Sequence, residues 1–243
     1  MALLEASQLT KQFGGLIAVK DLDITIEPGE IIGMIGPNGA GKTTAFNLIS
    51  GFYKPNNGHI LFNGMDITGL RPDQICKKGL ARTFQLVKPF PGIKVIDNVM
   101  IGALINTNDT HIARTKAKEI LEFLEMANLG HQLAGNLPVA SAKRLEIAKA
   151  LATSPKLILL DETMAGLRPV ETEEIIRVVR KISDNGIALL LIEHVMRVIM
   201  ALAQRVIVIH HGIKIAEGEP EEIINNKFVI DAYLGEEKYD VTD

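Results

Sequence analysis

The 243-residue sequence has little cysteine, no long apolar run and no excess of charge of either sign. Its single cysteine, Cys76, excludes an internal disulfide framework and is typical of a reducing compartment. It contains no run of about 18 apolar residues, so we expect no membrane-spanning segment, and any membrane role must go through a partner. The formal net charge of −3 gives no sign of a nucleic-acid partner. The composition is therefore that of an ordinary globular protein.

What the sequence does contain is a glycine-rich loop that fits the phosphate-binding pattern G-x-x-x-x-G-K-[ST] at every fixed position. Such a loop points backbone N–H groups at phosphate oxygens, and the helix after it aims its positive end at the same anion. Lys42 can reach the β and γ phosphates, and the Thr43 hydroxyl is placed to bind Mg²⁺. We therefore expect ATP or ADP with Mg²⁺ here. The loop residues are Gly36, Pro37, Asn38, Gly39, Ala40, Gly41, Lys42, Thr43 and Thr44.

The neighbours of this loop argue against an ordinary glycine turn. Residues 30–35 read as a short buried strand, and residues 45–50 read as a helix that ends at Gly51. Strand, glycine loop and helix in this order are the context that the motif requires.

Predicted strands and helices alternate along the rest of the chain, which favours an α/β fold with a mostly parallel sheet. Alternating runs before the loop, and the Asn63-Gly64 hairpin signal after it, predict an antiparallel β subdomain as well. The pattern is helical from residue 95 to about residue 129. We interpret residues 1–243 as one domain, with the α/β core in 1–85 and 153–243 and an inserted α-helical subdomain in 86–152.

Two carboxylates, Asp161 and Glu162, follow the apolar run 157–160, which reads as a buried strand. Ligands of open α/β sheets bind beyond the carboxyl ends of such strands. Asp161 can hold Mg²⁺, directly or through water, and Glu162 is the natural general base beside it. A helix cap or a solvated turn is the alternative reading, and the upstream phosphate loop makes it the weaker one.

Together these motifs resemble the ATP-binding subunit of an ABC transporter over nearly the whole chain. The resemblance implies a P-loop NTPase core and ATP hydrolysis coupled to transport. It makes Gln85 a residue that senses Mg²⁺ and water, and His194 a histidine that hydrogen-bonds the γ-phosphate. Phe13 sits where the family has an aromatic ring that stacks on adenine. The implied catalytic residues are Glu162, His194 and Gln85, and the implied metal-binding residues are Thr43, Gln85 and Asp161.

Further segments resemble branched-chain amino-acid uptake ATPases, with urea or short-amide uptake ATPases as close relatives. This implies separate membrane permeases, a substrate-binding protein, and a cytoplasmic location on the inner face of the cell membrane. The segments are Arg82-Thr83-Phe84-Gln85, Asn98-Val99, Leu145-Glu146-Ile147-Ala148 and Asp231-Ala232-Tyr233-Leu234-Gly235-Glu236.

One motif departs from the family pattern. ABC ATPases carry a signature, L-S-G-G-Q, or L-S-Y-G-Q or L-P-Y-G-Q in the branched-chain subfamily, that faces the γ-phosphate bound by the opposite subunit. The chain lacks its glycine, glutamine and serine, and has Leu137, Pro138, Val139, Ala140 and Ser141 at the aligned positions. Either the chain pairs with a different ATPase subunit whose signature is intact, which we favour, or it forms a weakly active dimer.

Two other functions were weighed against a transport motor. A soluble ABC ATPase of repair or translation would carry long coiled-coil insertions or tandem cassettes, and 243 residues hold neither. A regulatory nucleotide-binding module would fit the altered signature. The presence of Glu162 and His194 argues against it.

Overall fold

The computed structural model describes residues 2–85 and 87–237 of the chain, and it contains two β-sheets. A six-stranded sheet has the order β10-β9-β3-β8-β7-β6, and a four-stranded sheet has the order β2-β1-β4-β5. The strands are β1 Leu4–Phe13, β2 Leu16–Ile26, β3 Ile31–Ile35, β4 Asn57–Phe62, β5 Met65–Asp66, β6 Leu80–Arg82, β7 Leu157–Asp161, β8 Ala188–Ile192, β9 Arg205–His210 and β10 Ile213–Gly218.

The larger sheet is mostly parallel, as predicted, with only β10 running antiparallel to its neighbour. Every residue of β3, β7 and β8 is buried, because helices or the second sheet cover both faces. Ile158 and Leu160 pack into the core shared with α5 (Val139–Ala152) and α6 (Pro169–Asp184). Leu157 and Leu159 pack into the core shared with α1 (Lys42–Ile49) and the smaller sheet. The two-residue period of the strand therefore feeds two separate cores.

The four-stranded sheet is antiparallel throughout and covers α1. Its last two strands form the expected hairpin, in which Phe62 pairs with Met65. Asn63 and Gly64 both have positive φ angles, 51° and 73°, as a two-residue hairpin turn requires.

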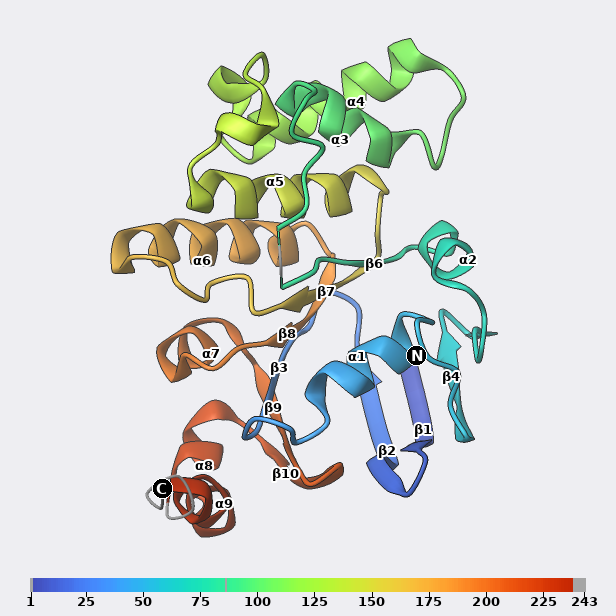
Figure 1. The fold of residues 1–243 in the computed structure, drawn as a ribbon, viewed down its shortest axis with the longest axis vertical. Helices are drawn as coiled ribbons and strands as arrows, with labels where there is room; N and C mark the ends of the chain where they lie inside the picture. The colour runs from blue at the N-terminus through green and yellow to red at the C-terminus, as the bar shows by residue number, and fades with distance from the viewer. Residues whose placement is uncertain (1, 86, 238–243) are drawn as a thin grey trace.

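Helices α5 and α6 pack into one core and α1 packs into the other, and Figure 1 shows the arrangement of all the helices. Helices α3, α4 and α5 gather at the top of the view, and α8 and α9 lie at the bottom. No helix among residues 2–85 and 87–237 is both long and apolar enough to cross a bilayer. The helices are α1 Lys42–Ile49, α2 Pro72–Lys77, α3 Val95–Ala103, α4 Thr110–Phe123, α5 Val139–Ala152, α6 Pro169–Asp184, α7 Met196–Leu202, α8 Pro220–Ile224 and α9 Lys227–Glu237.

Some expected elements have different bounds. The helical run predicted over 95–129 is broken between α3 and α4, where the Asp109 side chain accepts hydrogen bonds from the backbone N–H groups of His111 and Ile112 and so starts a new helix. Residues 80–85 read as a strand in the sequence, but β6 and its parallel pairing with β7 end at Arg82. Helices α7 and α9 were not predicted.

Candidate nucleotide-binding site

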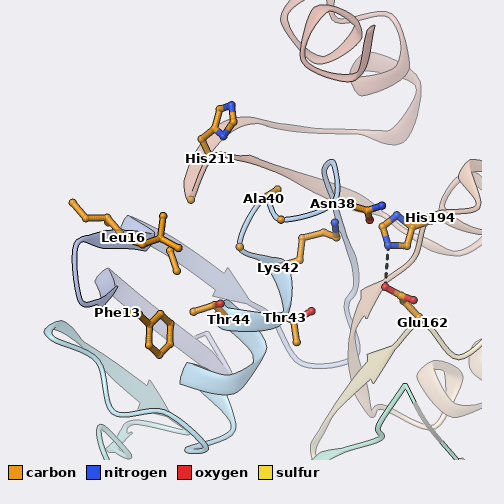
Figure 2. Close-up of a pocket in the computed structure, with 15 residues that line it drawn as sticks. Phe13, Leu16, Asn38, Ala40, Lys42, Thr43, Thr44, Glu162, His194 and His211 are labelled. Atoms are coloured by element: carbon orange, nitrogen blue, oxygen red, sulfur yellow. Dashed lines mark hydrogen bonds and ion pairs between the residues drawn. The ribbon is translucent and has the colours of Figure 1, made fainter. Parts of the chain in front are cut away.

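A cavity of about 410 Å³ opens beside the loop that joins β3 to α1, and Figure 2 shows the residues around it. The predicted residues Asn38 to Thr44 form one wall, and Phe13 belongs to the wall built by β1 and β2. Glu162 and His194 close the cavity on the side of the larger sheet. Its size is within the usual range for small-molecule sites, about 300–1,000 Å³.

The loop can take its path only with glycine at two of its positions. Gly36 and Gly41 have φ angles of 152° and 108°. A Cβ atom on Gly36 would lie 2.0 Å from the carbonyl oxygen of Ile209, and one on Gly41 would lie 2.4 Å from that of Ala18. Glycine is therefore required here both by the backbone conformation and by the packing of the loop against β9 and β2.

Lys42 is the first residue of α1, and its side chain folds back over the loop. Its Nζ donates to the carbonyl oxygens of Gly36 and Pro37 at 2.6 and 2.7 Å. Gly36 and Pro37 do not line the cavity themselves. The loop thus holds the ammonium group in the position from which it can bind an anion in the cavity.

Three predicted residues from three different strand ends meet at Glu162. Gln85 follows β6, Glu162 follows β7 and His194 follows β8. Gln85 Nε2 donates to Glu162 Oε2 at 2.5 Å, and His194 Nε2 lies 2.9 Å from Glu162 Oε1. Both carboxylate oxygens therefore have a fixed partner, and the group is oriented at the edge of the cavity (Figure 2).

Asp161 lies behind the cavity instead of in its wall. It is buried, and its Oδ2 accepts a hydrogen bond from Arg82 Nη2 at 2.9 Å. Burial raises the pKa of Asp161 above its ordinary value, and the contact with Arg82 opposes that shift. From the sequence, Arg82 was named only as part of a segment that resembles branched-chain amino-acid uptake ATPases. Its contact with Asp161 was not predicted.

The oxygen atoms near the cavity fit Mg²⁺ better than a metal that needs a full set of protein ligands. Thr43 offers a hydroxyl, Asp161 a single carboxylate and Gln85 an amide oxygen. No cluster of three or more His, Cys, Asp or Glu side chains suited to a metal occurs among the described residues. Mg²⁺ usually keeps several waters and takes the rest of its shell from one or two carboxylates and from substrate phosphates.

Two buried charged residues near the cavity escaped the sequence analysis. Glu193, 2% exposed, accepts a hydrogen bond from the Met164 N–H at 3.0 Å. Lys143 of α5 donates to the carbonyl oxygen of Ala165 at 2.6 Å and to that of Glu162 at 3.4 Å. Both side chains therefore hold the loop at residues 162–167. A charged residue at a position otherwise occupied by core side chains is the signal that could have identified them.

The altered signature begins α5. Pro138 precedes the helix, no side chain caps it, and the next residue, Val139, is 64% exposed. None of Leu137, Pro138, Val139, Ala140 and Ser141 lines the cavity. The N-terminus of α5 is therefore not part of this chain's own candidate site.

The aromatic residue predicted to meet adenine is partly exposed at the end of β1. Phe13 packs edge-to-face on Tyr53, with ring centroids 5.1 Å apart, and Lys11 Nζ lies 5.2 Å from the Phe13 ring. The cavity also includes Leu16 and His211, which the sequence analysis did not single out. One flat apolar face is thus available on the side of the cavity opposite Glu162 (Figure 2).

Comparison with known proteins agrees with the geometry. Residues 19–165 match the family model described as "ABC transporter", and residues 214–239 match the one described as "Branched-chain amino acid ATP-binding cassette transporter". The second match includes all of α9, whose side chains from residue 234 onward lie outside the described residues.

The chain is 39% identical to the high-affinity branched-chain amino acid transport ATP-binding protein BraF of Pseudomonas aeruginosa and 38% identical to LivG of Escherichia coli K12. Each alignment covers 96% of this chain and 98% of the relative. The solved structure of the ADP conformation of MJ1267, an ATP-binding cassette of an ABC transporter, has 32% identity and a TM-score of 0.89, and covers 97% of this chain and 99% of that one. The chain therefore belongs to the ABC transporter family.

Proposed function

We propose that this chain binds MgATP in the cavity and hydrolyses it as the motor subunit of an importer, with branched-chain amino acids as the transported substrate. The observation that carries the proposal is the fixed orientation of the Glu162 carboxylate, between Gln85 and His194, at the edge of a phosphate loop. A regulatory module without hydrolysis would have no use for such an oriented base.

In the proposed reaction each part of the cavity does one task. The N–H groups of the loop and the Lys42 ammonium bind the phosphates, and Phe13 supplies an apolar face for the base. Glu162 accepts a proton from the attacking water, while Gln85 and His194 keep its two oxygens aimed. Thr43, Asp161 and Gln85 would hold Mg²⁺, which supplies charge neutralisation for the phosphates.

The transported substrate is inferred from the relatives. BraF and LivG are described as branched-chain amino acid transport ATP-binding proteins, and the model that matches residues 214–239 is also described as one of branched-chain amino acid transporters. The chain would work at the cytoplasmic face of the membrane, with permeases that provide the path and a binding protein that selects the cargo. Uptake of urea or a short amide is the alternative. Measuring the uptake of leucine and of urea by the assembled transporter distinguishes the two substrates.

The second ATPase subunit is proposed to be a different chain with an intact signature. The support is the start of α5, where Val139, Ala140 and Ser141 replace the residues that would receive the partner's γ-phosphate. A Cβ on Ala140 restricts the backbone where the family has glycine. We propose docking of the permeases on the groove between residues 85–92 and the helical lobe, and of that stretch residue 86 lies outside the described residues.

The test of the proposed function is a comparison of Glu162→Gln with the parent protein. The substitution keeps the shape of the side chain and removes the base, so ATP should still bind while hydrolysis falls by about 10²–10⁴-fold. Phosphate release and binding of a fluorescent ATP analogue measure the two separately. Glu119→Gln, on the exposed side of α4, is the control that should change neither. An unchanged turnover number in Glu162→Gln would remove this residue from the mechanism.

A further inference from the structure

Arg82 joins the phosphate-loop helix to the strand that carries Asp161. Its side chain is 8% exposed, at the end of β6. Nη1 donates to Asn47 Oδ1 at 2.6 Å and to Ser50 Oγ at 3.1 Å, and Nη2 donates to Asp161 Oδ2 at 2.9 Å. One side chain thus ties α1 and β7 together beneath the cavity.

Stability alone is a poor explanation for this contact. The Arg82 Nε atom is buried and has no hydrogen-bond partner among the described residues, and a buried donor without a partner costs free energy. A buried ion pair is also, as a rule, no more stabilising than apolar side chains of similar volume. A role in the site accounts for a buried arginine that is only partly satisfied.

Aromatic rings restrict the guanidinium group from another side. Its Cζ lies 5.7 Å from the ring centroid of Phe46, 5.6 Å from that of Phe52 and 5.4 Å from that of Phe84. Phe52 and Phe84 also pack edge-to-face with each other. Arg82 therefore has little freedom to turn, and a group bonded to it takes up its fixed position.

The α1 end of this connection lies next to a predicted metal-binding residue. Asn47 follows Thr43 by four residues in α1, so the two side chains lie on the same face of the helix, one turn apart. Arg82 reaches that face and the Asp161 carboxylate at once, and it uses only one of the two carboxylate oxygens.

We propose that Arg82 is a positioning residue for the Mg²⁺ site, because its side chain sets the Asp161 carboxylate at a fixed distance from Thr43. This inference rests on the proposed nucleotide function of the cavity. Arg82 supports the metal and does not compete with it, because it is anchored on α1 and leaves one oxygen of Asp161 to the cation. Groups that hold a metal ligand in place typically raise metal affinity by about 10–100-fold.

The experiment is a Mg²⁺ titration of Arg82→Met in the presence of the fluorescent analogue mant-ADP. The apparent Mg²⁺ affinity should fall by about 10–100-fold relative to the parent. Binding of mant-ADP in EDTA should stay within about twofold, because the phosphate loop itself is untouched. The readout is metal and nucleotide binding, so it does not depend on hydrolysis.

Arg205→Met is the matched control, because Arg205 is another partly buried arginine of the same sheet. Arg205 lies on β9, pairs with Glu30 and Glu217 and does not line the cavity, so its loss should lower stability without changing Mg²⁺ affinity. Asn47→Ala provides a second test if Arg82→Met does not fold. It removes the anchor on α1 and leaves the ion pair with Asp161 in place, and it should also weaken Mg²⁺ binding.

An unchanged Mg²⁺ affinity in Arg82→Met, or in Asn47→Ala where only that variant folds, would overturn the proposal. A higher affinity would overturn it too, because it would make Arg82 a competitor of the cation. Failure of the parent protein itself to bind mant-ADP would refute the proposed function as well.

Discussion

At the scale of single residues, the surroundings of Glu193 strongly shift the pKa of its carboxyl group. Burial raises its pKa to about 7, although the Met164 N–H and Lys143 favour its charged form. The neighbouring carboxylates Glu162 and Asp161 raise the pKa further. The same burial lowers the pKa of Lys143 below its ordinary value. The two side chains therefore share a site in which full charge is costly for both.

This pKa shift predicts how stability depends on pH. The folded-state pKa of Glu193 lies above its ordinary value of 4.5. The contribution of Glu193 to the free energy of unfolding is therefore complete below about pH 4.5 and is lost as the pH rises to about 7. The loss amounts to about 3 kcal/mol. Glu193→Gln does not titrate and should escape it. Urea unfolding at several pH values should show the free energy of unfolding of the variant rising relative to that of the parent toward neutral pH. The same pH dependence in both proteins would contradict this.

Lys42 is the residue on which anion binding should depend most. Lys42→Ala removes the charge that the loop holds in place, and we expect mant-ADP affinity to fall by at least about tenfold, as loss of a charge-assisted contact does. Lys118→Ala, on an exposed face of α4, serves as the control. If Lys42→Ala binds the analogue as tightly as the parent, the phosphates do not lie in this loop.

At the scale of elements, α5 carries the altered signature at its N-terminus. Val139→Tyr, Ala140→Gly and Ser141→Gln together restore the family pattern and should raise the ATPase rate of the isolated chain at least about tenfold. The reason is that one preorganised donor to developing charge is worth about 10²–10³ in rate. A steady-state phosphate assay measures it. No rise, with nucleotide binding intact, would mean that another step limits this protein.

The elements differ in how far they could be predicted. The strand-loop-helix unit and the run before Asp161 were predicted because local glycine and apolar patterns determine them. The break between α3 and α4 was missed, because a single cap at Asp109 overrides a helical pattern that continues through it. Helix α7 was missed because its seven residues are too few for a periodicity signal and, unlike the shorter α2 and α8, it does not begin with a proline.

The site was predictable where chemistry shows in local sequence. Glu162 was proposed from its position after a buried strand, whereas Gln85 and His194 were named through the resemblance to a family, and the structure brings the three side chains together. The contact of Arg82 with Asp161 joins residues that are 79 positions apart in the sequence. The contacts of Lys143 with the 162–167 loop join residues that are 19 and 22 positions apart. No local pattern indicates such pairs, because they depend on how the strands and helices pack.

At the scale of the whole molecule, the proposed pairing predicts two unequal sites. In a dimer with a partner of intact signature, the site with this chain's Lys42 and Glu162 receives a complete set of donors. Glu162→Gln in this chain should therefore remove most of the turnover of the mixed dimer, whereas the same change in the partner should remove little. Equal losses from the two substitutions would contradict the asymmetry.

The bond from Lys143 to the 162–167 loop has a consequence for such a dimer. Lys143 stands one helical turn beyond Val139, and its Nζ holds the carbonyl oxygens of Glu162 and Ala165. A ligand that draws the start of α5 toward the neighbouring subunit would, through this single ammonium group, also shift the backbone of the proposed base. This chain would then time its own hydrolysis by the nucleotide that its neighbour holds.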